Sequence, residues 1–478
     1  MSNPASHGLD FAARAMRGTL LQAGGRGATF AGIAYDSRLV GAGQLFFALP
    51  GERVDGFAYA AQAAASGAAG IVVARTRGLP AGCEGVAVIA VDDPRLAMGD
   101  LARAVRANFR GHVVGVTGSM GKTTTKELVA AALRPLGAVL RTPGSLNTEV
   151  GMPVTILSST GGEAAWVLEM AMRGRGEIAY LADVAKPGVG VITNVSGAHL
   201  ERLGSIEEIA HAKGELFAGL GSDGIAIMPA DDPLIHAEAA PVASERRLVF
   251  DGAGRARLPV DVRVLEVIPA GAAGSVVRYA VRGTPLVVRL PLGGAHNARN
   301  AAAALAVALA VGVPLVEAAR ALETLELPPH RSAAVPAGGR VVLDDCYNAN
   351  PDAVRAALAS VVASAGAGRA FAILGDMLEL GPDAEELHRA VGRDAGQRLA
   401  GLVAVGARAE AFVAGAREAG LPADRVAAAA SPEDAAARVA AWTVPGDWVL
   451  VKASRGMKLE RAVEALVNTL KAASLGRA

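Results

Sequence analysis

The sequence is poor in cysteine and has no excess of either charge. Only two cysteines, Cys83 and Cys346, occur in 478 residues, and neither has a second thiol or a histidine at metal-ligand spacing. We therefore expect neither a disulfide framework nor a zinc site, and a cytoplasmic location fits this composition. Lys and Arg number 47 against 46 Asp and Glu, with no long basic run. Nucleic acid is not an expected partner, because binding its phosphates needs a concentrated positive field.

Long apolar segments are also missing. Residues 1–21 carry charges inside their apolar pattern and have no continuous hydrophobic region followed by a cleavage site, so secretion is not expected. The most apolar stretch, 301–316, is shorter than a bilayer span and is interrupted by Gly312 and Pro314. This stretch predicts a buried helix, and we expect a soluble protein without membrane insertion.

The chain length and the spacing of strand-like runs predict three α/β domains. At 478 residues, the chain exceeds what one hydrophobic core usually organises. The first domain, 1–110, contains short β-like runs separated by Gly/Pro turns, with an Ala-rich helix near 58–67. The runs lie at 45–49, 70–73 and 86–89. We expect a small α/β unit here.

Two larger α/β domains are predicted at 111–328 and 329–478. In the central domain, a buried-type strand at 112–116 leads into a helix that should end near Pro135, as in a doubly wound, mostly parallel sheet. Later strands are predicted at 166–168, 189–192 and 224–228. The Pro-rich segment 327–330 indicates a hinge before a C-terminal Rossmann-like domain. Its strands are predicted at 340–344, 371–374, 402–405 and 448–451.

A Gly-rich loop in the central domain indicates phosphate binding. It comprises Gly118, Ser119, Met120, Gly121, Lys122, Thr123 and Thr124. The strict P-loop pattern fails by one residue, because Val116 stands where glycine is required. Glycines still let backbone N–H groups face a phosphate, the helix N-terminus attracts anions, and Lys122 neutralises charge. ATP is favoured over GTP, because no guanine-reading N-K-x-D segment follows; an ordinary strand-to-helix turn is the alternative.

Three further polar side chains follow later strands of this domain. Glu169 comes directly after the strand at 166–168, at the edge where α/β ligand sites form, and is a candidate Mg²⁺ ligand beside the Thr123 hydroxyl. A solvated loop carboxylate is the alternative for Glu169. His199 follows another buried strand, and Lys213 lies one helix further on. For these two side chains, a structural or solvated role stays open.

Taken in order, these motifs resemble the Mur ligase family of cytoplasmic cell-wall peptide synthetases, through nearly the whole chain. The supporting segments lie at 35–38, 118–124, 147–149, 169–178, 194–199, 212–215 and 296–300. Two C-terminal segments, DDCYNANP at 344–351 and LGDMLELG at 374–381, discriminate within the family. They resemble the members that add a D-alanyl-D-alanine dipeptide more than those that add L-Ala, D-Glu or a diamino acid.

The resemblance implies a two-metal ATP site. Thr123 and Glu169 would serve one Mg²⁺ ion. His199 and a carbamate, formed on Lys213 by CO₂, would serve the second Mg²⁺ ion. Such a carbamate would invert the charge at that lysine.

The resemblance also implies nucleotide contacts from two domains. Asn300 would read adenine, Asp345 would hold the ribose, and Arg331 would reach the nucleotide from the third domain. This arrangement needs the third domain to close over the second.

Substrate contacts are implied for all three domains. The segment Asp36, Ser37 and Arg38 resembles the uridine-nucleotide pocket, and Asn147 lies where the muramyl substrate is contacted. Candidates for the dipeptide pocket are Asn348, Asn350 and Asp376, for which loop capping is the alternative. One departure is Ala453, which stands where the K-G-S-R segment of the family has glycine, and alanine adopts a positive φ less readily.

The implied reaction joins D-alanyl-D-alanine to UDP-N-acetylmuramoyl-tripeptide at the expense of ATP. Phosphoryl transfer would convert the carboxylate into an acyl phosphate, and the dipeptide amine would then attack it. The products would be the UDP-N-acetylmuramoyl-pentapeptide, ADP and phosphate, without a covalent enzyme intermediate. We expect a monomer. Two alternatives are a folylpolyglutamate synthetase-like ligase, with the same kind of loop and lysine, and a P-loop NTPase that acts as a switch or in transport.

Overall fold

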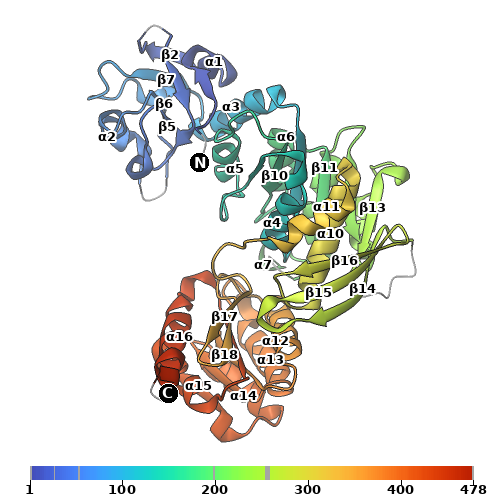
Figure 1. Cartoon of the computed structure of the whole chain (residues 1–478). Coiled ribbons are helices and arrows are strands. Elements are labelled where there is room, and N and C mark those ends of the chain that lie inside the picture. Colours follow the sequence, from blue (N-terminus) through green and yellow to red (C-terminus); the bar gives the residue numbers. More distant parts are fainter. Residues whose placement is uncertain (1–2, 26, 52–53, 198–199, 253–258, 476–478) are drawn as a thin grey trace.

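The chain folds into three α/β domains, each built on its own main sheet (Figure 1). The computed structural model describes residues 3–25, 27–51, 54–197, 200–252 and 259–475. The central domain lies between the N-terminal and C-terminal domains (Figure 1). This confirms the predicted α/β class and the three-domain organisation. None of the helices in the described part of the chain has the length and apolar character that a bilayer span needs.

The N-terminal domain is a five-stranded sheet in the order β2-β7-β6-β5-β4, with only β2 antiparallel to its neighbour. Strands β1 and β3 form a separate antiparallel pair. The elements are β1 (Ser6–Gly8), α1 (Leu9–Ala15), β2 (Thr19–Gln22), β3 (Thr29–Ala31), β4 (Ile33–Ala34), β5 (Leu45–Phe47), α2 (Ala60–Ala65), β6 (Gly70–Ala74), β7 (Ala87–Val91) and α3 (Pro94–Asn108). Helix α3 begins at Pro94 because the Asp93 side chain accepts N–H bonds from the first turn.

The central domain contains a nine-stranded sheet in the order β16-β15-β14-β13-β12-β11-β8-β10-β9. In this order, the neighbouring strands from β14 to β9, including β8, run parallel to one another. The elements are β8 (His112–Thr117), α4 (Lys122–Ala132), β9 (Val139–Arg141), α5 (Gly151–Ile156), β10 (Ala165–Glu169), α6 (Glu177–Ala185), β11 (Val189–Ile192), α7 (Leu200–Leu203), α8 (Ile206–Ala218), β12 (Ile225–Pro229), α9 (Pro233–Glu238), β13 (Arg247–Asp251), β14 (Val262–Pro269), β15 (Ser275–Val281), β16 (Thr284–Leu290), α10 (Ala295–Val311) and α11 (Leu315–Glu323).

Alternate residues of the central strands pack on opposite faces of this sheet. On β10, Trp166 and Leu168 join the core formed with α6 and α8, while Ala165 and Val167 join the core formed with α4 and α10. Burial on both faces explains the continuous apolar runs in the sequence. Strand β8 lies between β10 and β11, so loops from three neighbouring strands meet at one edge of the sheet.

The sequence predicted a mostly parallel sheet but not the antiparallel pairing of β15 with β14 and with β16. These strands extend the parallel sheet on the side away from β9 (Figure 1). The prediction of a buried helix at 301–316 is confirmed for residues 301–308, which are buried in α10. This helix ends at Val311, Gly312 adopts φ +81°, and α11 begins after Pro314.

The C-terminal domain has a six-stranded sheet in the order β17-β18-β22-β19-β20-β21, in which only β17 is antiparallel. The elements are β17 (Ala333–Ala337), β18 (Arg340–Asp344), α12 (Pro351–Ala365), β19 (Ala370–Gly375), α13 (Ala384–Gly396), β20 (Gly401–Val405), α14 (Ala409–Glu418), β21 (Val426–Ala429), α15 (Pro432–Trp442), β22 (Trp448–Lys452) and α16 (Glu460–Leu475). Single 3₁₀ turns occur between elements in all three domains. Helices cover both faces of the sheet, as the predicted Rossmann-like alternation requires.

Candidate active site

The Gly-rich loop connects β8 to α4 and depends on two glycines. Gly118 adopts φ +150° and Gly121 φ +75°. A Cβ atom added at Gly118 would lie 1.9 Å from the hydroxyl oxygen of Thr193, and one at Gly121 would lie 2.8 Å from the amide oxygen of Asn300. Neither position can therefore hold a side chain without displacing its neighbour.

The segment after β11 braces this loop. The backbone N–H of Ser119 donates to the carbonyl of Asn194 at 3.0 Å, and that of Met120 donates to the Asn194 side-chain oxygen at 2.9 Å. In return, the Thr193 hydroxyl and the Asn194 amide donate to the Met120 carbonyl at 2.6 and 3.1 Å. The loop thus has a fixed shape before any ligand arrives.

Lys122 begins α4 and folds back over the loop. Its ammonium donates to the carbonyls of Gly118 at 2.7 Å and Ser119 at 3.4 Å. Burial lowers the pKa of Lys122, nearby Glu169 opposes this effect, and repulsion by Arg331 adds to it. Arg331 of the C-terminal domain is thus the nearby cation that disfavours the charged form of Lys122. Thr124, in the same first turn, is partly exposed.

Glu169 is buried at the end of β10, where three side chains converge on its carboxylate. The Thr123 hydroxyl donates to Oε2 at 2.9 Å, and the Asn147 amide donates to Oε1 at 2.8 Å. The side chain is only 2% exposed, so it is not a solvated loop carboxylate. The hydroxyl of Thr123 and the carboxylate form a set of hard oxygen donors that suits Mg²⁺. Asn147, expected at the muramyl substrate, lies against this carboxylate.

Lys126 is a member of this site that the sequence motifs did not single out. It is fully buried, with its ammonium 2.6 Å from the Thr142 carbonyl, 3.0 Å from Glu127 and 3.7 Å from Glu169. Because Lys126 follows Lys122 by four residues, helical spacing alone puts both ammonium groups on the same side of α4. That spacing is the signal that could have identified it.

Lys213 lies inside α8 and is 1% exposed. Within the described residues, its ammonium has neither a hydrogen-bond acceptor nor a carboxylate partner. Burial, and secondarily repulsion by Lys122, lowers the pKa of Lys213 well below its ordinary value of 10.5. This shift favours the uncharged amine, which is the form of a lysine that adds CO₂. His199, the other expected ligand, lies outside the described residues.

Arg331 and Asp345 meet at the start of the C-terminal domain. The Ser332 backbone N–H donates to Asp345 at 3.0 Å, and Lys452 pairs with the same carboxylate. The Arg331 guanidinium lies 4.0 Å from the ring centroid of Tyr347. These contacts fix the backbone on both sides of Arg331.

The start of α10 faces these residues across the domain boundary. Burial lowers the pKa of His296, an effect that Asp345 opposes and Lys452 reinforces. Asn300 lies one turn further on, beside Gly121 of the loop. The two domains also touch directly, since a Cβ added at Gly294 would lie 2.6 Å from the Ser360 hydroxyl. The phosphate loop, α10 and the Asp345 segment are therefore neighbours at the boundary between the two domains.

The expected dipeptide residues follow the carboxyl ends of β18 and β19, which lie on either side of β22, although two of these residues are engaged in loop capping. Asn350 accepts the Ala353 N–H as the N-cap of α12, and Asp376 accepts N–H bonds from residues 407 and 408. The Asn348 side-chain oxygen accepts the adjacent Ala349 N–H, its one side-chain hydrogen bond among the residues that the structure describes. Ala453 is fully buried without a positive φ, so glycine is not required there.

The expected uridine-pocket residues lie far from the loop, in the N-terminal domain after β4. Asp36 and Arg38 form an ion pair at 2.6 Å, and hydrogen bonds from Arg38 lower the pKa of Asp36 to about 2. Ser37 is bonded to Gln62. A cavity of about 320 Å³ opens between α3 and α6, lined among others by Arg95, Glu149, Ala171, Arg175, Glu177 and Tyr180. The Ala171 N–H donates to the Asn147 carbonyl, so this cavity lies next to the Glu169 site.

Three family models match the chain in series. They describe a Mur ligase family catalytic domain at residues 29–106, a Mur ligase middle domain at 116–308, and a Mur ligase glutamate ligase domain at 330–455. The chain is also 38% identical to the UDP-N-acetylmuramoyl-tripeptide–D-alanyl-D-alanine ligase of Mycobacterium tuberculosis, over 91% of this chain and 92% of that protein.

Solved structures give the same result. MurF from Acinetobacter baumannii superposes with a TM-score of 0.85 at 30% identity, covering 98% of this chain and 99% of that one. MurF ligase from Thermotoga maritima, solved in complex with ADP, superposes with a TM-score of 0.81 at 30% identity, covering 93% of this chain and 98% of that one.

Proposed function

The chain belongs to the Mur ligase family, and we propose that it uses ATP to join D-alanyl-D-alanine to UDP-N-acetylmuramoyl-tripeptide. The product is the UDP-N-acetylmuramoyl-pentapeptide of peptidoglycan precursor synthesis. The observation that carries this proposal is the buried Glu169, held between the Thr123 hydroxyl of the phosphate loop and Asn147. Thr123 and Glu169 supply oxygen ligands beside the phosphate loop, and the cavity next to Asn147 offers room for the acid to be activated.

The phosphate loop holds the nucleotide during the reaction. The N–H groups of Gly121 and of the first turn of α4 face the phosphates, and Lys122 turns from its loop carbonyls to the transferring phosphoryl group. Bound Mg²⁺ supplies electrostatic stabilisation of the phosphoryl charge, and Thr123 and Glu169 are the residues that hold it. The buried ammonium of Lys126, 3.7 Å from the Glu169 carboxylate, holds this carboxylate in position.

Lys213 is proposed to be carbamylated. Its neutral amine attacks CO₂, the N–H proton leaves to solvent, and the resulting carbamate gives the buried site an anionic oxygen donor for a second Mg²⁺. The negative charge also offsets the cation of Lys122, whose repulsion contributes to the lowered pKa of Lys213. His199 is proposed as the partner ligand of this second ion.

The C-terminal domain completes the nucleotide site by closing on it. Arg331 approaches the phosphates, Asp345 takes the ribose and Asn300 contacts the base in this proposal. Closure excludes water, so the acyl phosphate meets the dipeptide amine and not a water molecule.

Each domain has its own role in this proposal. Domain 1–110 binds the uridine nucleotide, domain 111–328 binds ATP, and domain 329–478 closes over the nucleotide and binds the dipeptide. Asp36, Ser37 and Arg38 are proposed for the first task. For the last task we propose Asn348, Asn350 and Asp376, whose segments adjoin Asp345. Each task uses residues of a single chain, which supports action as a monomer.

Substrate-dependent ADP release tests this function. We expect ADP release to require the UDP-linked tripeptide and D-alanyl-D-alanine together, with one pentapeptide formed per ADP. Rapid ATP hydrolysis without either substrate would favour the NTPase switch. Turnover with a folate and glutamate would favour the folylpolyglutamate synthetase-like alternative.

A further inference from the structure

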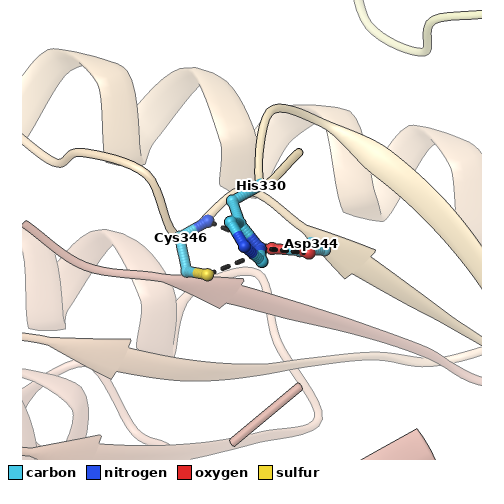
Figure 2. A group of neighbouring side chains, drawn as sticks. All are labelled: His330, Asp344 and Cys346. Atoms are coloured by element: carbon cyan, nitrogen blue, oxygen red, sulfur yellow. Dashed lines mark hydrogen bonds and ion pairs between the residues drawn. The ribbon is translucent and has the colours of Figure 1, made fainter. Parts of the chain in front are cut away.

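Three potential metal ligands converge where the chain enters the C-terminal domain, adjacent in sequence to Arg331 and Asp345 (Figure 2). His330 lies in the segment before β17, Asp344 ends β18, and Cys346 follows two residues later. The Nδ1 atom of His330 lies 2.8 Å from Oδ2 of Asp344, and the Cys346 sulfur lies 3.1 Å from Oδ1. One donor atom from each of the three residues lies within 4.8 Å of the other two.

We propose that His330, Asp344 and Cys346 bind a divalent transition-metal cation of the Zn²⁺ type. Nitrogen, oxygen and sulfur donors together suit Zn²⁺, whereas Mg²⁺ takes oxygen donors. With bond lengths of about 2.0–2.3 Å, tetrahedral Zn²⁺ holds such donor atoms about 3.4–3.6 Å apart. The two separations of 2.8 and 3.1 Å need to lengthen by less than about 1 Å to reach this geometry. This inference goes beyond the proposed ligase activity and does not depend on it.

The charges of the three side chains also fit a buried dication. The Asp344 carboxylate and a Cys346 thiolate together carry two negative charges, and neutral His330 adds none, so the loaded site is neutral overall. On binding, the S–H bond of Cys346 breaks, its proton leaves to solvent, and a sulfur–metal bond forms with no change of oxidation state. Cys346 is fully buried, while the His330 side chain is 29% exposed and gives the ion its entry path.

The backbone holds the histidine in position before any ion arrives. His330 adopts φ +66°, a conformation uncommon for non-glycine residues, and its carbonyl accepts the Tyr347 N–H at 3.0 Å. The segment before β17 and the end of β18 are thereby tied together. The spacing argument in the sequence did not single out these residues, because His330 and Cys346 lie on either side of β17 and β18 and meet only when these two strands pair.

Cobalt absorption tests the proposal on the full-length protein. After removal of metals with a chelator, Co²⁺ is added in the presence of excess Mg²⁺, which keeps the oxygen-ligand site around Glu169 filled. We expect one equivalent of tetrahedral Co²⁺ with a thiolate-to-metal charge-transfer band, and displacement of this Co²⁺ by Zn²⁺. Cys346→Ala should abolish the band and weaken Zn²⁺ binding at least about 100-fold, beyond the usual cost of losing a second-shell partner.

Two further variants keep the outcome decisive. His330→Gln alters a partly exposed side chain, so the fold should persist while the tetrahedral spectrum is lost. Cys83→Ala removes the other buried cysteine and should leave band and affinity unchanged. Absence of a thiolate band in the parent protein would overturn the proposal, as would a band that survives Cys346→Ala or disappears in Cys83→Ala. In those cases the three side chains form a hydrogen-bonded cluster only.

Discussion

Replacement of Lys213 by methionine should change how the stability of the protein depends on pH. In the folded chain, burial and the Lys122 cation lower the pKa of Lys213 well below 10.5, whereas the unfolded chain keeps the ordinary value. Between these two pKa values, the unfolded state binds one proton more than the folded state, so the free energy of unfolding rises with pH. Methionine fills a similar volume and carries no proton, which removes this contribution.

The size of the effect follows from the proton count. A difference of one proton corresponds to about 1.4 kcal/mol per pH unit at 25 °C, and for a domain of this size that shifts Tm by roughly 3 to 6 °C. The Lys213→Met variant should therefore be the more stable protein at pH values between the folded and the unfolded pKa of Lys213. Its advantage should shrink by about this amount with each pH unit across that window, because the unfolded lysine then approaches its own pKa.

Calorimetry in CO₂-free buffer at several pH values measures this difference, because carbamylation is then prevented. The three domains are expected to unfold in separate transitions, and only the transition of the central domain should respond. Lys471→Met, which removes an exposed lysine of α16, is the matched control and should follow the parent protein at every pH. A constant difference between parent and Lys213→Met would refute the reasoning, since Lys213 would then be protonated in the folded chain.

Three further predictions concern neighbouring groups. Lys126→Met should lower kcat at least about tenfold with little change in the KM for ATP, because the Glu169 carboxylate loses the ammonium that holds it in position. Steady-state kinetics that show a parent-like kcat would contradict this. Glu169→Gln should raise the Mg²⁺ concentration needed for half-maximal activity at least about tenfold, and an unchanged Mg²⁺ titration would exclude it as a ligand. Asp447→Asn should destabilise the C-terminal domain by about 1–3 kcal/mol, measured as a lower Tm. Burial raises the pKa of Asp447, but hydrogen bonds from Arg369 and Val444 lower it by more, so the net shift is downward. The ionised carboxylate therefore stabilises the fold above pH 3.8, and this stabilisation is lost as the pH falls further.

The fold was largely predictable from the sequence, because parallel strands buried on both faces leave continuous apolar runs. The runs at 112–116 and 189–192 correspond closely to β8 and β11. The antiparallel strands β14 to β16 escaped prediction, since a half-exposed strand such as β16 alternates its burial and lacks such a run. Helix α4 ends at Ala132 and a 3₁₀ turn contains Pro135, so the helix end was foreseen to within a turn.

The candidate site was predictable where it follows local chemistry and less so where it depends on tertiary contacts. The loop from Gly118 to Thr123 was readable because glycine and lysine at those spacings have few other uses. The sequence spacing left open whether Glu169 and Lys213 are solvated. The structure shows that both side chains are buried and that Lys213 lacks an anionic partner within the described residues. For Asp376, the sequence left dipeptide binding and loop capping open, and its carboxylate accepts N–H bonds from the loop after β20. The dipeptide role of Asp376 stays a prediction.

The most direct test of carboxylate activation by ATP is an oxygen-isotope transfer measurement. The UDP-linked tripeptide is labelled with ¹⁸O in its terminal carboxylate and converted with ATP and D-alanyl-D-alanine in unlabelled water. If an acyl phosphate forms, each inorganic phosphate released carries one ¹⁸O atom from that carboxylate, detectable by mass spectrometry. Phosphate free of ¹⁸O, formed together with pentapeptide, would contradict activation of the carboxylate by phosphoryl transfer.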